Sequence, residues 1–226
     1  MSIFREIVTL WKTDDLLSQA WHESHQMMTL SNEIFNKAIS YLRDGKDIKT
    51  LKKLKKRDQE INEFQKNVRK KVITHFSVSK NVDDIPSGLV LLSIVVDIER
   101  VGDYTKNILD LAINHPNKII SEDILEELFD IENEVIARFR KTLDSINAQD
   151  EEIAEELLNT YKKNLVRVSD KIVTKCIAGE IRFDDEAKSV SVALYARYLK
   201  RIGAHLKNIT TTVINPYEYV GYKTPE

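Results

Sequence analysis

Turn-forming residues are scarce in this chain, and their scarcity restricts its fold more than any other feature of the sequence. The 226 residues include six glycines and four prolines, whereas average proteins contain roughly 12% of the two types together. Sandwiches and barrels join many short strands by tight turns, which need these residues. Charged residues make up 31% of the chain, as is typical of long exposed helix faces. We therefore expect an all-α protein.

The overall charge and the apolar segments indicate a soluble, cytoplasmic protein. The 34 basic and 36 acidic residues give a net charge of −2, so no overall field favours nucleic acid as a partner. The longest apolar stretch, 88–96, is far shorter than the about 20 residues of a membrane span, and the N-terminus lacks a signal-peptide pattern. We expect contact with a membrane to be peripheral at most. The single cysteine excludes an intramolecular disulfide.

Helix-breaking residues divide the chain into six long helical segments. Their expected ranges are about 14–44, 47–76, 83–114, 121–147, 150–178 and 184–214, with a break at Pro116 between the third and the fourth. The third and sixth segments end in related sequences, DIERVGDYTKNI at 97–108 and YLKRIGAHLKNI at 198–209. Five residues recur at a constant offset of 101, which indicates a duplication. We predict two tandem three-helix bundles, at 1–118 and 119–226.

Both ends of the chain carry segments that do not belong to the six helices. Residues 1–13 place apolar side chains at helical spacing, which predicts an amphipathic helix lying on the bundle; a membrane-surface or partner-binding helix is the alternative. Residues 215–226 carry three tyrosines without periodicity. This pattern predicts an irregular strap across the surface, with a peptide-like docking tail as the alternative.

Carboxylates interrupt the apolar stripes of the second and third predicted helices. Asp58 lies on the stripe of the second, while Glu99 and Asp103 are four residues apart on the third and share a face. Asp97 points about 200° away from Glu99, at roughly 100° per residue, so it is not part of the group. Burying an unpaired carboxylate costs several kcal/mol. If the two helices are neighbours, the three acids need a cation.

Two kinds of cation fit this acidic group. A group of oxygen ligands without histidine or cysteine suits iron, manganese, magnesium or zinc, and helical bundles do build carboxylate metal sites. Alternatively, Arg100, Lys106 and the basic run 52–57 supply ion pairs that neutralise the same acids. The spacing leaves both interpretations open. The basic run is itself either a solvated helix face or a contact surface for an acidic partner or lipid headgroups.

The second half keeps the signals of the fold but not the acids. The equivalents of the two third-helix carboxylates are Lys200 and Ala204, so an acidic site is expected in the first half only. Gly102 and Gly203 both lie within helices, where glycine costs about 1 kcal/mol relative to alanine. Close approach of a neighbouring helix would explain both glycines.

The segment 97–108 resembles the signature of the PhoU family of phosphate-uptake regulators, with Glu99 and Asp103 at its E-x-x-x-D positions. The segment 57–62, RDQEIN, is similar to the companion motif of that family on the second helix. The duplicated six-helix layout also resembles the family, across nearly the whole chain.

This resemblance implies a function, a cofactor and a ligand set. Family members are cytoplasmic, non-enzymatic negative regulators of phosphate import. They contact a phosphate transporter subunit, a phosphate-sensing histidine kinase, or both. Their acidic motifs hold multinuclear iron or zinc clusters on the bundle surface. Carried over to this chain, the metal ligands are Asp58, Asn62, Glu99 and Asp103, with Asn62 at a position that is acidic in the motif.

Other hypotheses remain open beside this one. A metal-storage or metal-dependent bundle enzyme is expected to show two Glu-x-x-His motifs, and the sequence has none. A metal-free scaffold associated with a sodium/phosphate cotransporter would keep the fold without the cluster. Helical surfaces form dimers readily, so a homodimer is a further expectation. His22 and His25, three residues apart, are either a metal-binding pair or surface residues.

Overall fold

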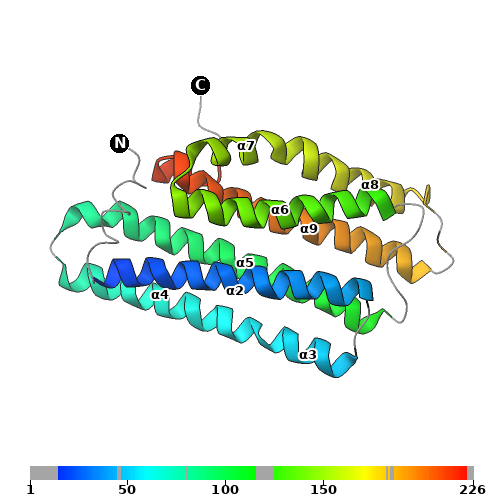
Figure 1. The fold of residues 1–226 in the computed structure, drawn as a ribbon, viewed down its shortest axis with the longest axis horizontal. Coiled ribbons are helices and arrows are strands. Elements are labelled where there is room, and N and C mark those ends of the chain that lie inside the picture. The colour runs from blue at the N-terminus through cyan, green and yellow to red at the C-terminus, as the bar shows by residue number, and fades with distance from the viewer. Residues whose placement is uncertain are drawn as a thin grey trace.

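The protein consists of two helical bundles that lie side by side (Figure 1). The computed structural model describes residues 15–44, 47–79, 81–115, 125–181, 183 and 186–222, and every regular element in these ranges is helical. The first bundle contains α2 (Leu16–Asp44), α3 (Ile48–Lys56), α4 (Asp58–Val78), a 3₁₀ turn (Val82–Asp84) and α5 (Ile85–Asn114). The second contains α6 (Leu125–Ala148), α7 (Glu151–Tyr161), a π-helical turn (Lys162–Val166), α8 (Arg167–Ile177), α9 (Glu186–Ile214) and a 3₁₀ turn (Tyr217–Tyr219).

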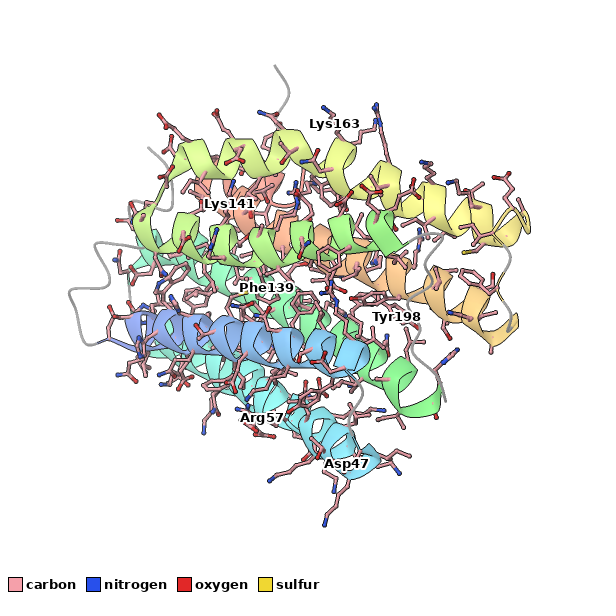
Figure 2. The ribbon with its side chains drawn as sticks, turned by 45° about the vertical axis from the view of Figure 1, so that its right-hand side comes forward. Asp47, Arg57, Phe139, Lys141, Lys163 and Tyr198 are labelled. Atoms are coloured by element: carbon pink, nitrogen blue, oxygen red, sulfur yellow. The ribbon has the colours of Figure 1, made fainter. Side chains whose placement is uncertain are left out.

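The predicted all-α fold with two bundles is confirmed, but two of the predicted helices are interrupted. The second breaks at Arg57, labelled in Figure 2, whose N–H bonds to the Leu54 carbonyl at 3.0 Å in a tight turn. The fifth contains the π turn, where the N–H of Arg167 bonds five residues back to the Lys162 carbonyl. Neither break contains glycine or proline, so the positions of helix-breaking residues in the sequence predict neither of the two breaks.

Glycine allows an inner helix of each bundle to pack closely against its neighbour. A Cβ atom at Gly102 of α5 would lie 3.0 Å from Ile61 Cδ1 of α4. A Cβ atom at Gly203 of α9 would lie 2.1 Å from Leu165 Cδ2 of the π turn, a distance that forces one of the two groups to move. The predicted close approach is confirmed in both halves.

The two bundles meet chiefly along α5 and α9, where the two copies of the repeat face each other. Asp97 Oδ1 lies 2.7 Å from His205 Nδ1 and accepts a hydrogen bond from Asn208 Nδ2 at 3.1 Å. The rings of Tyr104 and Tyr198 face each other with centroids 6.1 Å apart. At the repeat offset, Asp97 corresponds to Tyr198 and His205 to Tyr104. The two contacts are therefore equivalent, and an approximate two-fold axis runs between the helices.

A buried polar network joins α2 to the second bundle. Glu132 of α6, 2% exposed, pairs with Arg43 of α2 and accepts a hydrogen bond from the Tyr195 hydroxyl of α9. Burial raises the pKa of Glu132, against the opposing effects of the Tyr195 hydrogen bond and the Arg43 charge. Apolar contact accompanies this network, since the ring centroids of Phe35 and Phe139 lie 5.6 Å apart; Phe139 is labelled in Figure 2.

The segment 215–222 folds back on α9, which confirms the strap for this part of the C-terminal segment. Asn215 Nδ2 donates to two carbonyls within the strap at 2.9 and 2.8 Å, and the N–H of Gly221 donates to Thr211 Oγ1 of α9 at 2.7 Å. The predicted boundary near residue 118 and the predicted helix at 1–13 lie outside the described residues. Among the residues that the structure describes, no helix combines the length and hydropathy of a membrane span.

Replacing Tyr195 by phenylalanine tests the buried network. The change leaves a carboxylate oxygen of Glu132 without its donor, so we expect the free energy of unfolding at pH 7 to fall by about 1–3 kcal/mol. The pKa of Glu132 should rise further, because the hydroxyl that favours its charged form is gone. Chemical denaturation measures the first effect and carboxyl-carbon NMR the second. Tyr198→Phe, with a partly exposed ring on the same helix, is the control; equal losses in both variants would contradict this role of Tyr195.

Candidate functional site

The structure brings together the three carboxylates of Asp58, Glu99 and Asp103, which we call the acidic cluster. The break at Arg57 makes Asp58 the first residue of α4, where the positive end of the helix dipole favours a carboxylate. Glu99 and Asp103 lie one turn apart on α5. Between them, Gly102 allows Asp58 to approach, since a Cβ atom there would lie 3.5 Å from Asp58 Oδ1.

A lysine of α5 lies within the acidic cluster. Lys106 Nζ is 2.8 Å from Asp58 Oδ2 and 3.1 Å from Asp103 Oδ1. The Asp58 and Lys106 side chains are 13% and 31% exposed, so water screens this ion pair only in part. Asn62 presents its amide nitrogen to Asp58 Oδ2 at 3.4 Å. It therefore acts as a hydrogen-bond donor, whereas a metal ion would need the amide oxygen.

The pKa of Lys106 reflects the same surroundings. Desolvation alone lowers the pKa, but the hydrogen bonds to Asp58 and Asp103, together with their negative charges, outweigh that effect and raise it. The side chain is therefore an ammonium ion at neutral pH, and it supplies the cluster with a positive charge.

Glu99 has the weakest cationic partner in the cluster. Arg100 Nη1 lies 3.0 Å from Asp103 Oδ2, but Arg100 Nε is 3.7 Å from Glu99 Oε2, and the arginine side chain is 53% exposed. Burial raises the pKa of Glu99, and the negative charges of Asp103 and Asp58 raise it further, against the opposing charges of Arg100 and Lys106. Three carboxylates thus share two cations.

The side chains in this arrangement do not fit the predicted iron or zinc ions. Within the described residues, no three His, Cys, Asp or Glu side chains are placed so that they could hold one metal ion. Asp58 Oδ1 is buried without a hydrogen-bond partner, but the other oxygen of Asp58 and the facing oxygen of Asp103 are bonded to Lys106. Metal binding by Asp58, Asn62, Glu99 and Asp103 stays a prediction that this geometry does not favour.

Comparison with known proteins identifies the family. The PhoU domain matches the chain twice, at residues 25–112 and 128–213, so that each bundle contains one match. The chain belongs to the PhoU family. A search of curated proteins finds no match.

Two solved PhoU structures have a similar fold. PhoU from Pseudomonas aeruginosa is 21% identical, with a TM-score of 0.77 over 88% of this chain and 95% of that chain. The phosphate transport system regulatory protein PhoU from Streptococcus pneumoniae is 16% identical, with a TM-score of 0.73 over 88% of this chain and 93% of that chain. At these identities, the likeness shows the shared fold.

The described residues of the second PhoU domain hold its helices together with Lys200 and Ala204 at the positions of Glu99 and Asp103. Lys200 occupies the position that Glu99 has in the first repeat. Its Nζ lies 2.6 Å from Asp170 Oδ1 of α8. Tyr161 packs against Gly203: a Cβ atom added to this glycine would lie 3.6 Å from Tyr161 Cε2. The guanidinium of the buried Arg138 lies 5.7 Å from the centre of the Tyr161 ring. This domain keeps the close approach at its glycine and surrounds it with an aromatic ring and basic groups.

Sequence reasoning misses the polar contacts between the two PhoU domains. The helical spacing correctly turns Asp97 away from the acidic cluster, but it gives no sign of its partner His205, 108 residues along the chain. The two nearby histidines of α2 each have a hydrogen-bond partner of their own in the structure, and metal binding by the pair stays untested. His22 lies 3.1 Å from an amide of its own helix, and His25 lies 2.7 Å from Asn147 Oδ1.

Replacing Glu99 by glutamine tests the charge balance of the acidic cluster. The folded-state pKa of Glu99 is above its unfolded value of 4.5. Stability therefore falls as the pH rises from the unfolded pKa through the folded pKa. Glutamine removes this loss, so we expect the variant to be more stable than the wild type at pH 7, by on the order of 1 kcal/mol. Well below pH 4.5, the two proteins should be equally stable.

Chemical denaturation at the two pH values measures this effect. Glu63→Gln is the control, because Glu63 of α4 is 65% exposed and outside the cluster; it should leave the stability almost unchanged. A loss of stability at pH 7 in Glu99→Gln would contradict this charge balance, because that loss is expected if Glu99 ligates a structural metal ion.

Proposed function

We propose that this protein regulates phosphate uptake by contacting other proteins and catalyses no reaction itself. The observation that carries the proposal is the match of a PhoU domain to each bundle. One of the two similar structures is described as a phosphate transport system regulatory protein. The partners that we propose are a phosphate transporter subunit and a phosphate-sensing histidine kinase, contacted in the cytoplasm.

The exposed lysines of α3 are the surface that we propose for an acidic partner. Lys49, Lys52, Lys53 and Lys56 are exposed, whereas Lys55 and Arg57 are held in ion pairs with carboxylates of the first bundle. Four exposed like charges on one short helix repel one another, and an acidic partner would relieve that repulsion. Leu51 and Leu54 of α3 are buried in the core of the first bundle and fix the orientation of this surface.

Charge reversal on α3 tests the proposal. In a strain that lacks this protein, we expect the phosphate-starvation response to stay on when phosphate is plentiful, and the wild type to switch it off again. The test variant changes Lys52, Lys53 and Lys56 to glutamate; the control changes Lys66, Arg69 and Lys70, which are exposed on α4. The α3 variant should fail to restore control and should capture several-fold less transporter or kinase in affinity purification. The α4 control should behave as the wild type.

The possible outcomes test the regulatory function and the α3 contact surface separately. Normal phosphate control in the deletion strain would contradict regulation of phosphate uptake. Full capture and full control by the folded α3 variant would contradict the proposed surface and leave the regulatory function standing.

A metal-free scaffold associated with a sodium/phosphate cotransporter is a second candidate. The ion pairs of Lys106 with Asp58 and Asp103 favour a metal-free domain. The captured transporter distinguishes the candidates, because the first predicts components of an ABC importer and the second a sodium-coupled cotransporter. Light scattering of the purified protein tests the predicted homodimer.

A further inference from the structure

We propose that Lys106 is the resident cation of the first PhoU domain and that it excludes iron and zinc from the acidic cluster. The proposal concerns the side chains of α4 and α5. It does not rest on the proposed regulation of phosphate uptake, so either can fail without the other.

The Lys106 ammonium joins the two helices that a shared metal ion would join. Its Nζ lies 2.8 Å from Asp58 on α4 and 3.1 Å from Asp103 on α5. A zinc ion bound to the same carboxylate oxygens would lie about 2.0–2.2 Å from them and therefore beside the ammonium. Two cations at such a separation repel strongly, so the lysine has to leave before the metal ion can bind.

The remaining contacts of the cluster also oppose a metal ion. Asp103 uses both of its oxygens, one on Lys106 and the other on Arg100 at 3.0 Å. Asn62 presents a donor nitrogen to Asp58. Lys106 lies three residues after Asp103 on the same helix, so the α5 backbone fixes the ammonium close to the carboxylates. Asp58 Oδ2 and both oxygens of Asp103 are thus bonded to groups of the same chain, whereas Asp58 Oδ1 has no hydrogen-bond partner.

The repeat offers an internal comparison for this lysine. Lys207 of α9 is the equivalent of Lys106, but alanine replaces the neighbouring acid in that half. The ammonium of Lys207 donates to the carbonyl of Gly221 in the C-terminal strap at 2.7 Å. The same repeat position thus holds a lysine that bonds to another segment in both domains. In the first domain the lysine bonds to carboxylates, and in the second it bonds to a backbone carbonyl. Only the first arrangement would release a pair of acids if the lysine were removed.

Metal retention by purified variants tests the proposal. Wild-type, Lys106→Met and Lys106→Arg proteins are loaded with excess Zn²⁺, or with Fe²⁺ without oxygen, then desalted and analysed for bound metal by mass spectrometry. We expect no stoichiometric metal in the wild type or in Lys106→Arg, which keeps the charge. Lys106→Met should retain zinc, with affinity increased about tenfold or more, because the repelling charge is gone.

Two further variants locate the effect. Lys207→Met is the matched control, since it removes the equivalent lysine where that lysine donates to a backbone carbonyl instead of a carboxylate, and it should retain no more metal than the wild type. Asp58→Asn in the Lys106→Met background should abolish the gain. Circular dichroism shows whether each variant is folded, and Lys106→Gln, also uncharged, serves in place of Lys106→Met if the latter is unfolded.

Two results would overturn the proposal. The first is stoichiometric iron or zinc in the wild type that Asp58→Asn or Asp103→Asn removes. The second is a folded, uncharged variant at position 106 that takes up no more metal than the wild type, because a group other than Lys106 would then exclude the ions.

Discussion

The packing of α5 on two sides is the constraint on which the rest of the structure depends. One side of this helix contacts α4 at Gly102, and another contacts α9 through Asp97 and Tyr104. Because a helix has 3.6 residues per turn, residues two positions apart point to opposite sides of it. Asp97 therefore faces the second domain, while Glu99 faces α4. A rotation of α5 would disturb both contacts. The acidic cluster and the interface between the domains are thereby linked through one rigid element.

This packing also explains why the charge of the cluster has to be balanced locally. The contact at Gly102 holds Asp58 against α5, and its Oδ1 atom is buried. A carboxylate in such surroundings needs a cation within ion-pair distance, and Lys106 provides one from the same chain. On this account, the first domain reaches its folded shape without a supply of metal. The regulation that we propose would then rest on exposed surfaces such as the lysines of α3.

The sequence predicts the helices and the faces of their residues well, because both follow from local rules. Glycine or proline follows the ends of α2, α5, α8 and α9 within two residues, and spacing alone separates Asp97 from Glu99. The breaks at Arg57 and at the π turn involve neither residue type and depend on local backbone geometry that spacing does not encode. The cation could not be chosen from sequence, since Lys106 and a metal ion both satisfy the spacing. That choice depends on side-chain positions across two helices.

Anomalous X-ray scattering at the zinc and iron edges tests the central claim most directly, on wild-type crystals grown with each metal. The account predicts that the Lys106 ammonium lies within hydrogen-bond distance of Asp58 and Asp103, with no anomalous peak beside these carboxylates. A strong peak bonded to both carboxylates, with the lysine side chain turned away, would contradict it.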